Sequence, residues 1–251
     1  MTPYRESQFR KLADPPTLAM INEWDSVSNN VFARPIEIVV DDRRNNPRIP
    51  PIQGEINLAY PIAIKQEVVL GVWVESFPNL ELQTVAHEIG HWILKLRGFR
   101  GMLCQPRDIP REGIFNDVAS HRPLYVLQKS TGYDPQDEVD SRCDHDIKLC
   151  SQRGAIDEKF SALYFADDLL NGSYKKRRQL KWALRKKHPN TLRYVDRILQ
   201  VASEHDLLNP EQNIAFRKML VKELKLAGTW SEQDDIKRTK ELIKKAEGKV
   251  P

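Results

Sequence analysis

The sequence has few cysteines, no long apolar run and no strong excess of either charge. Its three cysteines, Cys104, Cys143 and Cys150, are too few and too scattered for a disulfide framework. No stretch reaches the roughly 20 apolar residues of a transmembrane helix, and the polar start lacks a secretory signal pattern. We therefore expect a cytoplasmic protein with reduced thiols and no membrane partner.

The overall composition is that of an ordinary folded chain. The formal net charge is only +4, and 40% of the 251 residues are hydrophobic. These proportions argue against global disorder and do not by themselves indicate a nucleic-acid-binding protein. A chain of this length can form one large domain, or a catalytic domain with a helical extension.

Apolar patterns along the chain predict an α+β fold. The first 30 residues suit one or two short helices broken at Pro15 and Pro16. The expected strands cover residues 36–40, 55–64 and 67–75, and the expected helices cover 80–96, 114–129, 156–170, 191–206, 211–226 and 232–247. The chain therefore divides into a mixed part, residues 1–172, and a helical, basic C-terminal extension, residues 173–251.

One expected helix carries the pattern His-Glu-x-x-His at residues 87–91. Residues four apart on a helix lie one above the other on the same face, so His87 and His91 can both face one metal ion. Glu88 stands beside them and is placed to take a proton from a water molecule as a general base. Apolar residues on both sides of the motif would bury the opposite side of the helix.

This motif, on a helix that follows several strands, resembles the zincin metallopeptidases. The resemblance covers about residues 35–95 and implies a zinc-dependent hydrolase of peptide or protein substrates, with Zn²⁺ on His87 and His91 and Glu88 as catalytic base. It implies N-terminal helices, a small mixed sheet and the motif helix, followed here by a helical C-terminal part. In that family the strand before the motif helix, here residues 67–75, forms an edge along which substrate lies.

A catalytic zinc ion usually has a third protein ligand, and three residues are candidates. His121, on the next expected helix, is the first choice, and Asp117, one turn earlier on the same face, is an alternative. Glu158 begins a helix that resembles the glutamate helix of ImmA/IrrE-type metallopeptidases, where the glutamate binds zinc. The continuation that marks metzincins is absent, because residues 96–99 do not contain its third histidine.

Cys143, His145 and Cys150 form the other cluster of potential ligands in the sequence. Their spacing fits no common zinc module, and no second Cys/His pair follows them. We interpret this segment as a polar loop with buried or free thiols.

The start of the C-terminal extension is strongly basic. Residues 175–187 are dense in lysine and arginine and include Trp182, with Tyr174 just before them. Basic residues with aromatics among them can hold a nucleic-acid backbone, but a charge run on a helix is more often a solvated face, which we favour. The alternative function is a DNA-associated regulatory protein that binds through residues 173–251 and uses the zincin-like part as a sensor or scaffold.

Overall fold

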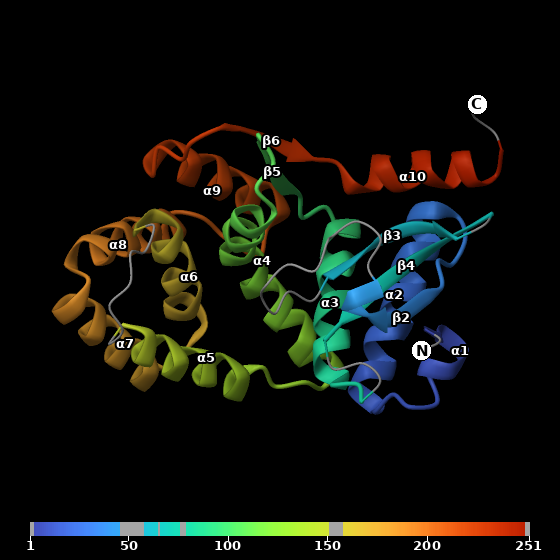
Figure 1. Ribbon diagram of the computed structural model, residues 1–251, viewed down its shortest axis with the longest axis horizontal. Helices are drawn as coiled ribbons and strands as arrows, with labels where there is room; N and C mark the ends of the chain where they lie inside the picture. Colours follow the sequence, from blue (N-terminus) through green and yellow to red (C-terminus); the bar gives the residue numbers. More distant parts are fainter. Residues whose placement is uncertain (1–2, 46–57, 65, 76–78, 151–157, 249–251) are drawn as a thin grey trace. The chain divides into compact units, whose positions relative to one another are not determined.

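Two small sheets and a series of helices make up the part of the chain that the structure describes (Figure 1). The structure is a computed structural model, and its described residues are 3–45, 58–64, 66–75, 79–150 and 158–248. Contacts divide the chain into two units: the first is Met1–Arg97, Leu127–Tyr133 and Asp234–Pro251, and the second is Gly98–Val126 and Asp134–Gln233. The expected α+β class with a small mixed sheet is confirmed.

The first unit contains a four-stranded sheet with the order β1-β2-β4-β3. Its strands are β1 (Tyr4–Arg5), β2 (Ile38–Asp42), β3 (Leu58–Ile64) and β4 (Glu67–Val74). β2 runs parallel to β4, and β3 runs antiparallel to β4. The strand expected over residues 55–64 is described from Leu58 onward, and residues 55–57 lie outside the described residues.

β4 is a central strand of this sheet, so the expectation that residues 67–75 form its edge is wrong. The strand is buried along its length after Glu67, and its unbroken apolar sequence is typical of a strand covered on both faces. The edge strands are β1 and β3, and in β3 the residue Pro61 pairs with Leu70 of β4. An edge tolerates proline, which has no N–H to donate to a second neighbouring strand.

Two helices precede β2 in the first unit: α1 (Glu6–Phe9) and α2 (Pro15–Phe32). The expected break at Pro15 and Pro16 is confirmed, but the second helix is not short, because these prolines begin an 18-residue helix. Proline suits a first helical turn, where the backbone N–H groups have no intrahelical partner. Asp14 caps this turn by accepting a hydrogen bond from the backbone N–H of Thr17 at 2.9 Å.

The motif helix is α3 (Leu82–Leu96), and it packs against α2, β3 and β4. The side chain of Trp92 ties it to the edge strand, since its indole N–H donates to the backbone carbonyl of Ala59. α3 ends at Leu96 with Arg97 as its C-cap, and Gly98 follows with a φ of +96°, a conformation that favours glycine. The last helix of the chain, α10 (Asp235–Ala246), packs against α3, β3 and β4 as well.

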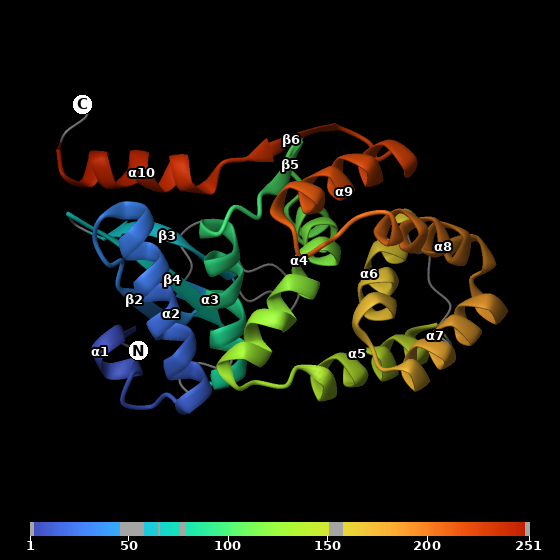
Figure 2. The ribbon, with the colours of Figure 1, turned by 180° about the vertical axis from the view of Figure 1, so that it is seen from behind.

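The second unit is mostly helical, as both views of the ribbon show (Figures 1 and 2). It contains most of α4 (Ile109–Thr131), then α5 (Gln136–Leu149), α6 (Glu158–Asn171), α7 (Tyr174–Lys187), α8 (Pro189–Ser203) and α9 (Pro210–Glu223), together with the strand pair β5 (Gly101–Gln105) and β6 (Thr229–Gln233). One apolar cluster from α4, α6, α7, α8 and α9 forms its core. None of the helices in the described ranges has the length and apolarity needed to cross a bilayer.

The C-terminal part and the cysteine segment each differ from expectation in one respect. The described part of this extension, residues 173–248, contains the helices α7, α8, α9 and α10 and also the strand β6, which pairs with β5. Cys143 and His145 lie on α5, so the expectation of a polar loop is wrong there. Cys143 and Cys150 are buried free thiols. The division into a catalytic part, 1–172, and an extension, 173–251, concerns function and stays a prediction.

A proline inside α4 is compensated by a side chain from α9. Pro123 has no N–H with which to bond the carbonyl of Ala119, four residues earlier. The buried amide of Asn213 donates to that carbonyl at 2.7 Å and to the carbonyl of Leu207 at 2.9 Å. The segment of α4 that contains His121 is therefore held by α9 through a buried hydrogen bond.

Asn213→Ala should lower the free energy of unfolding by about 1–3 kcal/mol, because buried carbonyls lose their donor. Adding Pro123→Ala restores a backbone N–H opposite Ala119 and should recover about 1 kcal/mol of that loss. Urea denaturation of the single and double variants measures both effects. If Pro123→Ala changes stability equally with and without Asn213, the two positions are not coupled and this account of α4 fails.

Candidate metal centre

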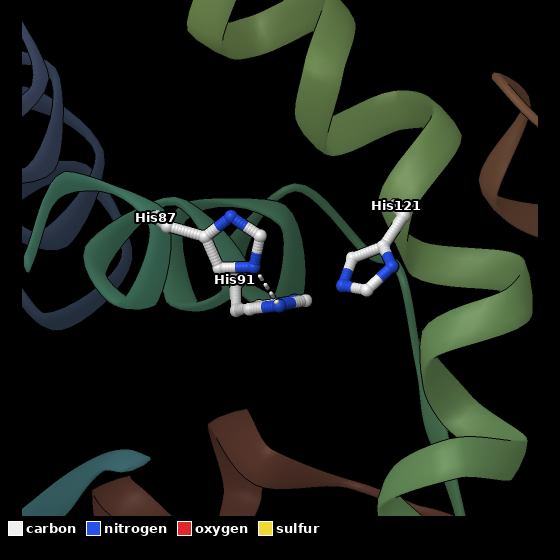
Figure 3. A group of neighbouring side chains, drawn as sticks. All are labelled: His87, His91 and His121. Carbon is white, nitrogen blue, oxygen red and sulfur yellow. Dashed lines mark hydrogen bonds between the residues drawn. The ribbon is translucent and has the colours of Figure 1, made fainter. Parts of the chain in front are cut away.

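The side chains of His87 and His91 lie next to each other on the side of α3 that is not fully buried (Figure 3). The Nε2 atoms of His87 and His91 lie 3.2 Å apart, and the rings stand nearly edge to face at 74°. Both side chains are half-buried. The opposite side of α3 is fully buried through Val85, Ala86, Ile89 and Ile93. Packing on that side therefore sets the rotation of α3 and with it the direction of both histidines.

The distance between the two Nε2 atoms suits a shared metal ion. Zinc–nitrogen bonds are about 2.0–2.1 Å, so two ligands on a tetrahedral ion stand about 3.3 Å apart. The observed separation of 3.2 Å is close to that value. The four-residue spacing predicted this juxtaposition, and the structure places both rings accordingly.

His121 on α4 completes a group of three potential ligands (Figure 3). One ligand atom from each of His87, His91 and His121 lies within 4.8 Å of the other two. Three imidazole nitrogens around one point are a donor set that can hold a metal ion. The limit of 4.8 Å is wider than the roughly 3.3 Å between two ligands of a tetrahedral zinc ion.

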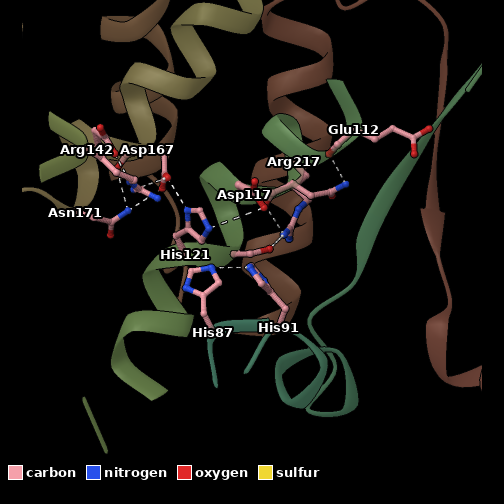
Figure 4. Close-up of polar contacts among 12 residues, drawn as sticks. His87, His91, Glu112, Asp117, His121, Arg142, Asp167, Asn171 and Arg217 are labelled. Atoms are coloured by element: carbon pink, nitrogen blue, oxygen red, sulfur yellow. Dashed lines mark hydrogen bonds and ion pairs between the residues drawn. The ribbon is translucent and has the colours of Figure 1, made fainter. Parts of the chain in front are cut away.

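A carboxylate fixes the orientation of the His121 ring (Figure 4). Its Nδ1 lies 2.6 Å from Oδ2 of Asp167 on α6, and both side chains are buried. Burial opposes the imidazolium, but the charges of Asp167 and Asp117 outweigh it and raise the pKa of His121. A proton held on Nδ1 by a carboxylate leaves Nε2 as the ligand atom and makes the ring a stronger base.

Asp167 is itself held by two further side chains (Figure 4). Arg142 on α5 donates to its Oδ2 at 3.0 Å, and Asn171 donates to its Oδ1 at 2.9 Å. Burial disfavours its charge, but the neighbouring His121 and Arg142 outweigh that effect and lower the pKa of Asp167. Arg142 also pairs with buried Asp168 at 2.7 Å. Sequence reasoning missed this support, although two adjacent aspartates in the apolar part of α6 are a signal that such a network exists.

The other sequence-predicted residues lie outside this histidine group. Asp117 lies on α4 with its Oδ1 4.0 Å from Nε2 of His121, and its side chain is 44% exposed. Glu158, exposed at the start of α6, accepts a hydrogen bond from Asn190 at 3.4 Å. Glu88 follows His87 on α3 and is half-buried. The geometry thus brings the two motif histidines together with His121 rather than with Asp117 or Glu158.

Comparison with known proteins gives no relative for this chain. No family model matches it, and neither a curated protein nor a solved structure gives a significant match. Any function therefore has to be argued from the residues and their geometry.

If His121 is a ligand, His121→Ala should reduce bound metal, while Glu158→Gln should leave it unchanged. The reason is that, among the residues that the structure describes, His121 is the one whose ligand atom groups with those of the motif pair. Elemental analysis of the full chain, purified without chelator and then dialysed against a weak chelator, measures the difference. The opposite result, metal lost from the Glu158 variant and kept by the His121 variant, would reject this ligand set.

Asp167→Asn should weaken metal affinity by about 10–100-fold, the usual effect of removing a carboxylate that orients a histidine ligand. Asp168→Asn is the matched control, since it makes the same change at the neighbouring buried residue, which contacts Arg142 rather than His121. Competition against a chromophoric chelator gives both affinities. Equal weakening in the two variants would show damage to the buried network in general, and no role for Asp167 in orienting His121.

Proposed function

We propose that this chain is a zinc-dependent metallopeptidase of the zincin type. The observation that carries the proposal is the group of three imidazoles, two of which come from the His-Glu-x-x-His helix. Three protein ligands with one open position are typical of catalytic zinc, whereas structural zinc sites are closed by four. Imidazole also suits copper, iron and nickel, and the glutamate between the two histidines favours zinc.

Each residue of the site would have a separate role in hydrolysis. A bound zinc ion would supply Lewis acidity, which lowers the pKa of a water molecule and polarises a substrate carbonyl. His87, His91 and His121 would hold that ion, with His121 kept in one tautomer by Asp167. Glu88 would take the proton from the attacking water and deliver it to the leaving amine. This role requires that Glu88 does not itself bind the metal.

The edge strand gives a means of holding an extended peptide. β3 pairs with β4 on one side, and on its other side the described part of the chain contributes no strand to the sheet. A strand edge can bind peptide through backbone hydrogen bonds. The indole of Trp92 on α3 bonds to the β3 carbonyl of Ala59, so the candidate edge is fixed to the motif helix itself. We assign substrate to β3 in place of the strand expected from the sequence.

Glu88→Gln should strongly reduce cleavage and leave metal binding and folding intact. Glutamine keeps the shape of the side chain but cannot accept the proton, so hydrolysis should fall by about 10²–10⁴-fold. Glu81→Gln, the same change at the exposed N-terminal end of α3, is the matched control and should retain activity. Because no substrate is assigned, the measurement is a proteome-wide comparison of new peptide termini produced by each protein.

Three outcomes of that comparison decide the proposal. Fragments made by the wild type and the Glu81 variant, lost with chelator and absent with Glu88→Gln, support it. Fragments made equally by the Glu88 variant would contradict a general-base role. Fragments that persist when chelator has removed the metal would contradict a metallopeptidase.

A further inference from the structure

One face of α7 alternates aromatic and cationic side chains. Tyr174, Arg178, Trp182 and Lys186 follow one another at four-residue steps, so they form a single stripe along the helix. The two aromatic side chains are 69% and 59% exposed, which is unusual for rings of this size. The guanidinium of Arg178 lies 5.7 Å from the ring of Tyr174, and the ammonium of Lys186 lies 4.1 Å from the ring of Trp182.

The stripe lies in a strongly basic helix. Eight of the 14 residues of α7 are lysine or arginine, and none is acidic, so the helix itself supplies no counter-charge. Two of the eight are paired, Lys176 with Asp144 of α5 and Lys181 with Asp196 of α8. The other six make no ion pair with a described carboxylate: they are Lys175, Arg177, Arg178, Arg185, Lys186 and Lys187.

The apolar face of α7 packs inside the protein. Leu180, Ala183 and Leu184 are buried in the core of the second unit. The outward face therefore has no aliphatic side chains to insert into a bilayer, as a membrane-surface helix requires. What it offers instead is two flat rings and several cations that remain in water. These suit a ligand with planar apolar groups linked by anions.

We propose that this face of α7 binds single-stranded nucleic acid. Phosphates would contact the arginine and lysine side chains, and unpaired bases would stack on Trp182 and Tyr174. Base pairs in a duplex are stacked on each other and would leave the rings without a partner, so a single strand is the better fit. RNA and DNA share this chemistry, and binding depends on neither the histidine group nor the proposed peptidase activity.

The test is fluorescence anisotropy of labelled oligonucleotides of about 20 nucleotides, long enough for one binding site, titrated with the full chain. Single-stranded RNA, single-stranded DNA and a duplex of the same length are compared at about 50 and about 200 mM salt. We expect saturable binding to a single strand with a Kd of about 10⁻⁵ M or tighter at the lower salt concentration. Tighter binding to RNA or to DNA identifies which of the two nucleic acids is the ligand.

Substitutions on the stripe separate stacking from charge. Trp182→Ala should weaken binding by about 5–100-fold, and Trp182→Phe should keep most of the affinity because it keeps a ring. Arg178→Gln with Lys186→Gln removes two phosphate contacts and should lower the slope of log K against log salt by about 1.4, or 0.7 for each contact. All three side chains are exposed, so these changes should not affect folding.

Arg238→Gln with Lys240→Gln is the matched control. It removes the same charge from exposed positions of another basic helix, α10, and should leave affinity and salt slope unchanged. Control and stripe variants that weaken binding equally would overturn the proposal. So would absence of saturable single-strand binding up to about 100 μM at low salt, tighter binding to the duplex, or equal binding to heparin, a polyanion without bases. Binding to anionic vesicles that exceeds binding to the oligonucleotides would identify a membrane surface instead and overturn it as well.

Discussion

The histidine pair depends on how firmly α3 is buried. The helix is covered by α2 and by the sheet, and that packing fixes its rotation. Only then do two residues one turn apart keep their Nε2 atoms 3.2 Å apart. Apolar packing on the opposite side of α3 holds the two rings in this arrangement. A substitution there would alter the ligands without touching them.

The third histidine is positioned by a different means, a chain of buried polar contacts. Asp167 fixes the ring of His121, and Arg142 and Asn171 fix Asp167. Such networks specify one geometry because any unsatisfied member would leave a buried charge or donor without a partner. Two of the potential ligands thus rely on apolar packing, and the third relies on electrostatic interactions. Metal affinity should therefore respond to changes at buried positions of either kind.

The sequence predicted the parts of this structure that depend on local spacing. The motif helix, its stop at Gly98 and the pairing of His87 with His91 follow from helical period and glycine conformation. The central position of β4 in its sheet could have been predicted from its continuous apolar sequence. The Asp167–Arg142 contact could not be predicted in this way. It joins α5 and α6, and a local sequence pattern does not indicate which buried charged residues contact each other. Helix α5 was not predicted because its few apolar residues are separated by many polar and charged ones, so no apolar helical period is evident.

X-ray absorption at the zinc edge tests most directly whether these three histidines form one metal centre. On the purified full chain we expect about three imidazole nitrogens at about 2.0–2.1 Å and one water oxygen as the fourth ligand. His121→Ala should remove one imidazole from that shell. A shell containing sulfur, or one with the same imidazole count in wild type and His121→Ala, would contradict the account.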